Sequence, residues 1–106
     1  MATAPDNRPI GSYSRQIPRD RRFKINRWVK IRQPNGDTLN AKISDISRTG
    51  CRIECMVKPD TDKPVTIMID QAKRLNARIV WSSVGAYGCQ FDVRLNDREL
   101  TEIVWI

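Results

Sequence analysis

The chain has 106 residues, 40% of them hydrophobic, which predicts one domain with a single modest core. No apolar run is long enough to cross a bilayer, and residues 1–7 lack the apolar segment of a signal peptide, so we expect a cytoplasmic protein. The net charge of +7 favours an anionic partner, and the absence of histidine argues against histidine-based catalysis.

The excess positive charge lies in the N-terminal third of the chain. Residues 1–32 contain nine basic and two acidic residues, whereas residues 33–106 are neutral overall. Seven of these nine are arginines, whose planar guanidinium suits bidentate contacts with phosphate and guanine. Prolines, a glycine and the lack of periodicity predict a flexible lead-in over residues 1–14, and residues 15–26 are predicted to be a basic arm.

The remainder of the chain, residues 27–106, is predicted to be an all-β domain ending in a short helix. Apolar and polar residues alternate with a period of two in six segments, which are separated by turn residues such as the Pro-Asn-Gly of 34–36. The six expected strands are 28–32, 38–45, 51–56, 65–69, 75–81 and 87–93. Asn96 and Glu99 form the pattern of a capping box, and Leu100, Ile103 and Val104 share one face of the helix that follows. This order predicts a closed six-stranded antiparallel β-barrel, because closure removes exposed strand edges.

The chain has three cysteines, Cys51, Cys55 and Cys89. Their odd number, their spacing and the absence of histidine argue against a disulfide framework and against a structural zinc site. We therefore interpret them as small core residues and expect neither a metal nor a cofactor.

The alternation breaks in the second expected strand. The apolar positions up to Ile43 alternate with polar residues, and the same phase would send Asp45 and Ser47 into the core, where an unpaired carboxylate is very costly. Ile46 takes the apolar position instead. We interpret this break as turning Asp45 and Ser47 outward onto the barrel surface, before a turn in which Gly50 can supply a positive φ. An alternative is that both side chains bond to their own backbone in Asx- and ST-type turns.

Two sequence motifs follow, one in the basic arm and one in the predicted barrel. Residues 15–19 read RQIPR, an arginine pair separated by three residues, and residues 45–50 read DISRTG, which fits the pattern D/N-x-S-x-x-G. The chain resembles the PilZ domain family in the order of its features. These are an arginine pair, a linker, this second motif at a strand end, and six strands followed by a helix. The stretch RIVWSSVGAYGCQFD at 78–92 is similar to the family's late strand pair, and the resemblance spans residues 15–104.

The resemblance implies a receptor for cyclic di-GMP, a bacterial second messenger with two phosphates and two guanines. It assigns ligand contacts to Arg15, Arg19, Asp45, Ser47 and Gly50. Guanidinium groups can bind phosphate, donate to the O6 and N7 atoms of guanine and stack on bases, whereas a carboxylate can accept from guanine N–H groups. We expect the ligand to order the arm on the barrel and so to change the surface offered to a protein partner.

Other arginines leave the assignment of the pair open. Arg21, Arg22 and Arg27 lie in the same linker, although one residue too many separates Arg22 from Arg27 for the motif. Arg21, Arg22 and Arg48 are additional candidate contacts. Arg48 fits a phosphate contact and a solvated turn residue equally well.

Two further functions remain as alternatives. One is a PilZ-like adaptor that binds protein without nucleotide, and the other is a small basic barrel that binds nucleic acid through its phosphates. Single-strand binders need exposed aromatic platforms, whereas Trp81, Tyr87 and Phe91 fall on apolar positions that we assign to the core. The pattern does not decide the positions of Trp28 and Trp105. An enzyme is disfavoured, because the sequence offers no nucleophile–base pair and no glycine-rich phosphate loop.

Overall fold

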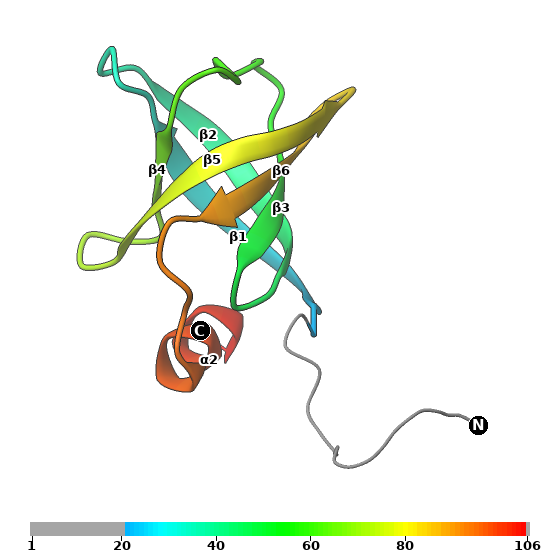
Figure 1. Ribbon diagram of the computed structural model, residues 1–106, viewed down its shortest axis with the longest axis vertical. Coiled ribbons are helices and arrows are strands. Elements are labelled where there is room, and N and C mark those ends of the chain that lie inside the picture. Colours follow the sequence, from blue (N-terminus) through cyan, green and yellow to red (C-terminus); the bar gives the residue numbers. More distant parts are fainter. Residues whose placement is uncertain (1–20, 106) are drawn as a thin grey trace.

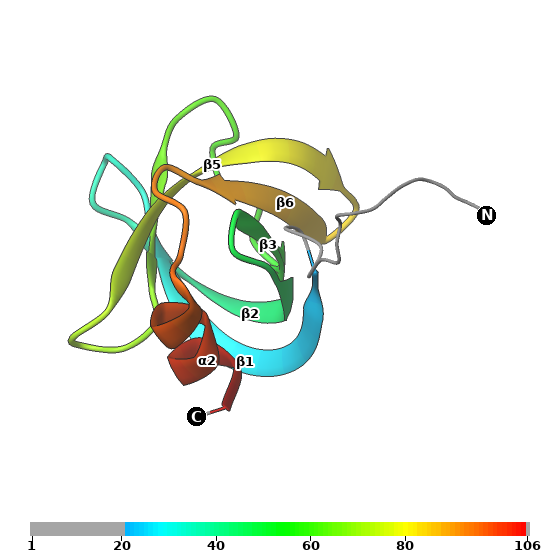
Figure 2. The same ribbon diagram turned by 60° about the horizontal axis from the view of Figure 1, so that its bottom comes forward.

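Six antiparallel strands close into a barrel in the computed structural model, which describes residues 21–105 (Figure 1). The strands are β1 (Phe23–Arg32), β2 (Thr38–Ile46), β3 (Gly50–Glu54), β4 (Val65–Met68), β5 (Arg74–Ser83) and β6 (Ala86–Phe91), and a helix, α2 (Asp97–Trp105), follows them. Their order around the barrel is β1-β2-β3-β6-β5-β4. Figure 2 shows the barrel with the end that lies beside α2 turned forward. The prediction of a six-stranded antiparallel barrel with a short C-terminal helix is confirmed.

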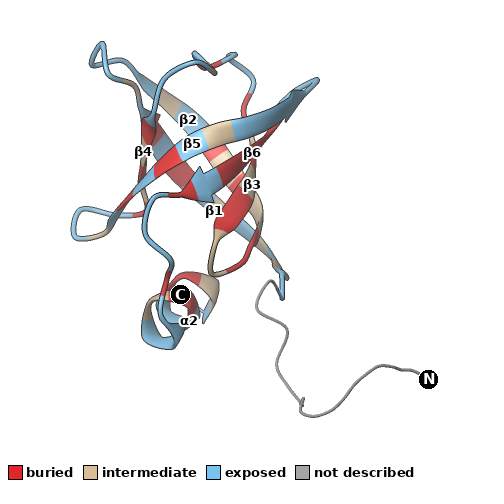
Figure 3. Ribbon diagram, viewed as in Figure 1, coloured by how far each residue is buried: buried red, intermediate tan, exposed pale blue. Residues whose placement is uncertain are grey.

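Aliphatic, aromatic and cysteine side chains form one continuous core inside the barrel. The strand segments that carry these buried residues are red in Figure 3. The largest side chains that are fully buried there belong to Ile31, Ile43, Ile46, Ile53 and Ile67. Each such side chain contributes about 1.5–3 kcal/mol by leaving water. The three cysteines are buried and unbridged, as predicted. A hydrogen bond with Cys89 and burial raise the pKa of the Cys51 thiol, which suits an inert core residue.

Strand β1 begins at Phe23, five residues before the expected strand, so residues 23–26 belong to the barrel and not to the arm. Its side chains alternate between inward and outward from the first residue onward, with Phe23 and Ile25 packed against the core. Arg27 occupies the next inward position. Because a charged residue stands where the alternation requires an apolar one, the start of the strand is not recognisable in the sequence. Arg27 is accommodated at the end of the barrel, where its Nη1 donates to the carbonyl oxygen of Ile103 in α2 at 3.3 Å.

Helix α2 packs beside the end of the barrel where β3 begins (Figure 1). Leu100 and Ile103 are buried, and the expected capping box is present: the Glu99 backbone N–H donates to Asn96 Oδ1 at 2.8 Å, and the Asn96 N–H donates to Glu99 Oε1 at 3.1 Å. The Lys73 ammonium and this backbone bond lower the pKa of Glu99. Within residues 21–105, no helix has the length and apolar character needed to span a membrane.

The assignment of Trp81 to the core is wrong. The pairing of β5 with β6 shifts register between Ile79 and Trp81, which marks a β-bulge and moves the later residues of β5 to a different phase. Trp81 is consequently 45% exposed, as is much of the end of β5 in Figure 3. Tyr87 and Phe91 are buried, as predicted, and Trp28 proves to be exposed.

Candidate functional site

A β-bulge at Ser44 shapes the start of the DISRTG segment. Ile43 pairs with Ile53 and Asp45 pairs with Arg52, so Ser44 is the extra residue of β2. A bulge bends its strand and shifts the side-chain phase by one position. This explains the break in the alternation: the next apolar residue faces the core, while Asp45 faces the rim of the barrel.

Asp45 is held by an arginine from the segment before β1. Arg22 Nε donates to Asp45 Oδ1 at 2.9 Å, and Arg22 Nη1 lies 3.4 Å from Ser47 Oγ. The Asp45 side chain remains 18% exposed, and the Arg22 side chain is 46% exposed. The chain just before β1 therefore lies against the second motif, with a guanidinium and a carboxylate side by side at the surface.

Ser47 is fully buried, so its expected position on the barrel surface is wrong. Its Oγ lies 3.2 Å from the backbone nitrogen of Thr49 and 3.3 Å from that of Gly50, and both of these N–H groups can donate to it. The turn is closed by a bond from the Ser47 N–H to the Gly50 carbonyl at 2.8 Å. Ser47 thus forms an ST-type turn, because its hydroxyl provides an acceptor for backbone groups that are shielded from water.

Replacing Ser47 by alanine is expected to lower the free energy of unfolding by about 1–3 kcal/mol, because two shielded N–H groups lose their side-chain acceptor. Urea unfolding measures this loss. Ser82→Ala, at an exposed position of β5, is the matched control and should change stability by less than about 0.5 kcal/mol. Equal stability of the two variants would contradict the structural role of the Ser47 hydroxyl.

Gly50 is required by close packing and not by a positive φ, which corrects the sequence interpretation. Positive φ angles occur instead at Gly36 and Gly85. Gly50 pairs with Gln90 at the start of β3, and a Cβ at this position would overlap the backbone carbonyl oxygen of Cys89. Only glycine lets β3 and β6 approach this closely directly after the turn.

Arg48 connects the turn to α2 and is not a freely solvated residue. Its guanidinium forms an ion pair with Asp97 in the first turn of the helix. Its carbonyl accepts a bond from the Leu95 N–H at 2.8 Å, and the neighbouring Thr49 carbonyl accepts one from the Phe91 N–H at 2.8 Å. The motif turn and the segment that leads into α2 are therefore physically joined.

The arginines of the N-terminal third have different positions. Arg15 and Arg19 lie outside the residues that the structure describes. Arg21 stacks over the ring of Phe23 with its guanidinium carbon 5.0 Å from the centroid. Arg22 is bonded to the second motif, whereas Arg27 reaches α2 and lies 3.9 Å from Asp70. The two arginines of the alternative pair, Arg22 and Arg27, thus contact two different parts of the molecule.

Comparison with known families agrees with this geometry. A family model of the PilZ domain matches residues 14–106. The chain belongs to the PilZ domain family. PilZ domains are ligand-binding modules that form a family of cyclic di-GMP receptors. The match includes both the arginine pair and the second motif.

One solved structure similar to this PilZ domain is the crystal structure of the PilZ domain of CeSA from a cellulose synthesizing bacterium. The TM-score is 0.59 at 17% sequence identity, and the match covers 79% of this chain and 91% of that chain. At this identity the likeness supports the fold alone. No curated protein matches the chain.

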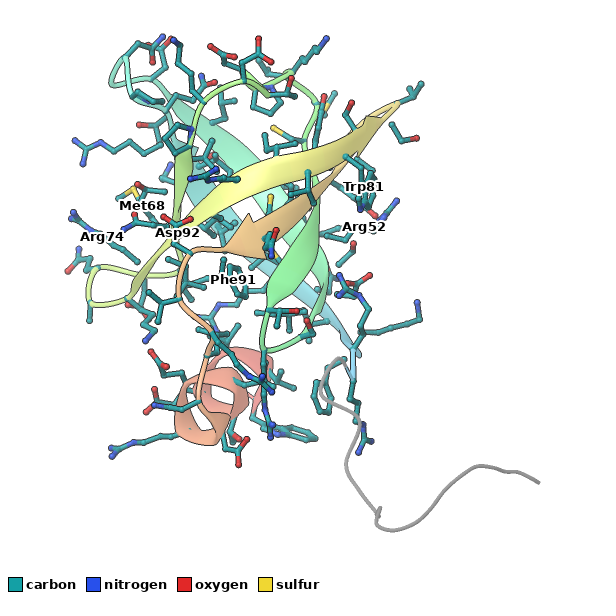
Figure 4. The ribbon with its side chains drawn as sticks, in the orientation of Figure 1. Arg52, Met68, Arg74, Trp81, Phe91 and Asp92 are labelled. Atoms are coloured by element: carbon teal, nitrogen blue, oxygen red, sulfur yellow. The ribbon has the colours of Figure 1, made fainter. Side chains whose placement is uncertain are left out.

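The structure of this PilZ domain adds two residues that the sequence interpretation missed, Trp81 and Arg52. Arg52 pairs with Asp45 on one side and with Gly88 on the other, and Gly88 pairs with Trp81. A Cβ at Gly88 would overlap the Trp81 indole, so the ring lies directly against this glycine. Figure 4 shows Arg52 and Trp81 on the same side of the barrel.

These residues form a row across four strands that we call the Asp45 row: Asp45, Arg52, Gly88 and Trp81. It presents a carboxylate, a guanidinium and an aromatic ring in succession on the outside of the barrel. Arg52 Nη1 is bonded to Ser44 Oγ at 2.8 Å and to Glu54 Oε2 at 2.6 Å, so its position is fixed. No local pattern in the sequence marks either residue, because the pairing of Trp81 with Gly88 depends on the bulge in β5.

Proposed function

We propose that this PilZ domain is a receptor that binds cyclic di-GMP between the arginine arm and the Asp45 row. The observation that carries the proposal is the bond from Arg22 to Asp45 at 2.9 Å, which brings the end of the arm against the second motif. Arg15 and Arg19 precede Arg22 by a few residues and have the charge and donor geometry to bind phosphate and guanine.

The Asp45 row has the chemistry that a guanine base requires. The carboxylate of Asp45 can accept hydrogen bonds from the N1–H and N2–H groups of guanine. These bonds would form beside its bond to Arg22 or in place of it. The exposed indole of Trp81 offers a face on which a base can stack, at about 1–3 kcal/mol for a base–aromatic contact. Ser47 and Gly50 contribute by setting the shape of the turn.

Ligand binding on this surface would also affect the contact between the motif turn and α2. Arg48 is ion-paired with Asp97, and a ligand phosphate would compete for its guanidinium. In this proposal, the ligand orders the arm on the barrel and weakens the connection between the motif turn and α2. The changed surface is then recognised by a protein partner.

A calorimetric titration of the full chain with cyclic di-GMP tests the proposal. We expect saturable binding that weakens as salt is added, because several of the contacts are ionic. GTP and a short single-stranded oligonucleotide serve as controls and should give no comparable heat. Absence of heat with cyclic di-GMP at high micromolar concentration, on folded protein, would refute the proposal.

A further inference from the structure

A tryptophan points outward from β1 between two hollows in the barrel surface. Trp28 is 69% exposed. One hollow, of about 410 Å³, is bounded by Trp28, Lys30 and Met68, and the other, of about 620 Å³, is bounded by Trp28, Leu39 and the segment after β3. Met68 lies on β4 and is labelled in Figure 4. Trp28 therefore forms a ridge that separates two depressions.

Apolar side chains of β2, of β4 and of the segment after β3 lie around this ridge. Together with the ridge they form what we call the Trp28 surface: Trp28, Leu39, Met56, Val57 and Met68. Met56 is entirely exposed and Val57 is 60% exposed. Single exposed apolar residues are common, but apolar residues gathered around hollows mark interaction sites. Tryptophan and methionine are enriched in protein interfaces, and methionine adapts its shape to a partner.

Two lysines, Lys30 and Lys42, and two acidic residues, Glu54 and Asp70, line the two hollows. Lys30 Nζ bonds to the neutral Asn40 side chain at 3.2 Å, which leaves its charge uncompensated by that contact. Both acidic residues are ion-paired: Glu54 is shared by Arg52 and Lys42, at 2.6 and 3.4 Å, and Asp70 lies 3.9 Å from Arg27. Once these partners are counted, four basic side chains stand against two carboxylates, so the local charge is net positive.

We propose that the Trp28 surface docks an acidic, amphipathic segment of a partner protein. Apolar side chains of that segment would occupy the two hollows on either side of the Trp28 ring, and its carboxylates would face Lys30 and the net positive cluster of Lys42, Arg52 and Glu54. Leucine, valine and methionine line this surface around one aromatic ring, which favours apolar protein side chains over a run of stacked bases. The surface shares no residue with the Asp45 row, so the inference does not depend on cyclic di-GMP binding.

Selection of short random peptides displayed on phage against the full chain tests this inference. We expect the enriched peptides to carry net negative charge and at least two apolar anchors. These peptides should bind Trp28→Ala at least about tenfold more weakly, as expected when a central interface tryptophan is lost. Lys30→Glu should lower the affinity of these peptides as well, and it provides a second variant if Trp28→Ala fails to fold.

Trp105→Ala is the matched control, because Trp105 is 78% exposed on α2 and lies outside the Trp28 surface; peptide affinity should not change. Enrichment of basic peptides, equal binding to wild type and Trp28→Ala, or no enrichment at all would overturn the inference. So would a single-stranded oligothymidylate that binds through Trp28, which would assign the surface to nucleic acid. Self-association that Trp28→Ala abolishes would assign it instead to a second copy of the chain.

Discussion

Replacing Arg15 or Arg19 by alanine is expected to remove most of the affinity for cyclic di-GMP while the thermal unfolding midpoint stays unchanged. Each guanidinium is proposed to make charge-assisted bonds to the ligand, and losing such a bond typically costs about 1.5–3 kcal/mol. This corresponds to roughly a ten- to hundred-fold loss of affinity, measured by calorimetry. Both positions precede β1, so their loss should not disturb the barrel core.

Arg21→Ala is the matched control for this pair. Its side chain belongs to the same basic stretch but stacks on Phe23, so its loss should change the affinity less. Arg27 is unsuitable as a control, because its bond to Ile103 supports α2. If Arg15 and Arg19 prove no more sensitive than Arg21, a diffuse basic arm explains the affinity better and the motif assignment is wrong.

Replacing Gly50 by alanine is expected to destabilise the barrel by about 1–3 kcal/mol or more. The added Cβ would overlap the carbonyl oxygen of Cys89, and relief of this overlap requires β3 and β6 to move apart at the start of their pairing. Because backbone atoms are involved, a change of side-chain rotamer cannot relieve it. Urea unfolding of the variant measures the loss.

Gly36→Ala separates this steric effect from backbone strain. Gly36 has a φ of 96° and no atom close to the position of a Cβ, so its replacement strains the backbone without a collision. Gly50→Ala should be the more destabilised of the two variants. If Gly50→Ala were as stable as wild type, the close approach of β3 and β6 would be wrong.

The alternation of apolar and polar residues predicted the barrel and most of its core. Hydrophobic side chains such as Ile31, Ile53 and Ile67 must leave water, and the period of two specifies which face of each strand does so. The capping box of α2 was also predictable, because Asn96 and Glu99 satisfy backbone groups within four residues of each other. Such local and periodic signals are fully present in the sequence.

Features that depend on tertiary contacts were not predictable. The start of β1 was missed because Arg27 occupies an inward position and is satisfied by a carbonyl of α2, far away in the chain. Trp81 was misplaced because a bulge in β5 changes the side-chain phase without any marker in the sequence. The tight approach at Gly50 likewise depends on β6, which no local pattern around the turn reveals.

The candidate site was predictable in part. The phase break at Asp45 correctly marked an irregular strand, which is the bulge at Ser44. The same pattern did not distinguish an exposed ligand contact from a buried turn, and for Ser47 the structure has the buried turn. Arg22 was one of several candidate arginines, and its bond to Asp45 sets it apart from Arg27.

The central claim is that cyclic di-GMP binds between the arginine arm and the Asp45 row. A titration of the isotopically labelled 106-residue chain with cyclic di-GMP, followed by the NMR chemical shifts of its backbone and indole N–H groups, tests it most directly. We expect saturable shifts at Arg15, Arg19 and Asp45 and at the Trp81 indole, and little change at Trp28. Shifts confined to the Trp28 surface, or none at saturating ligand, would contradict the account.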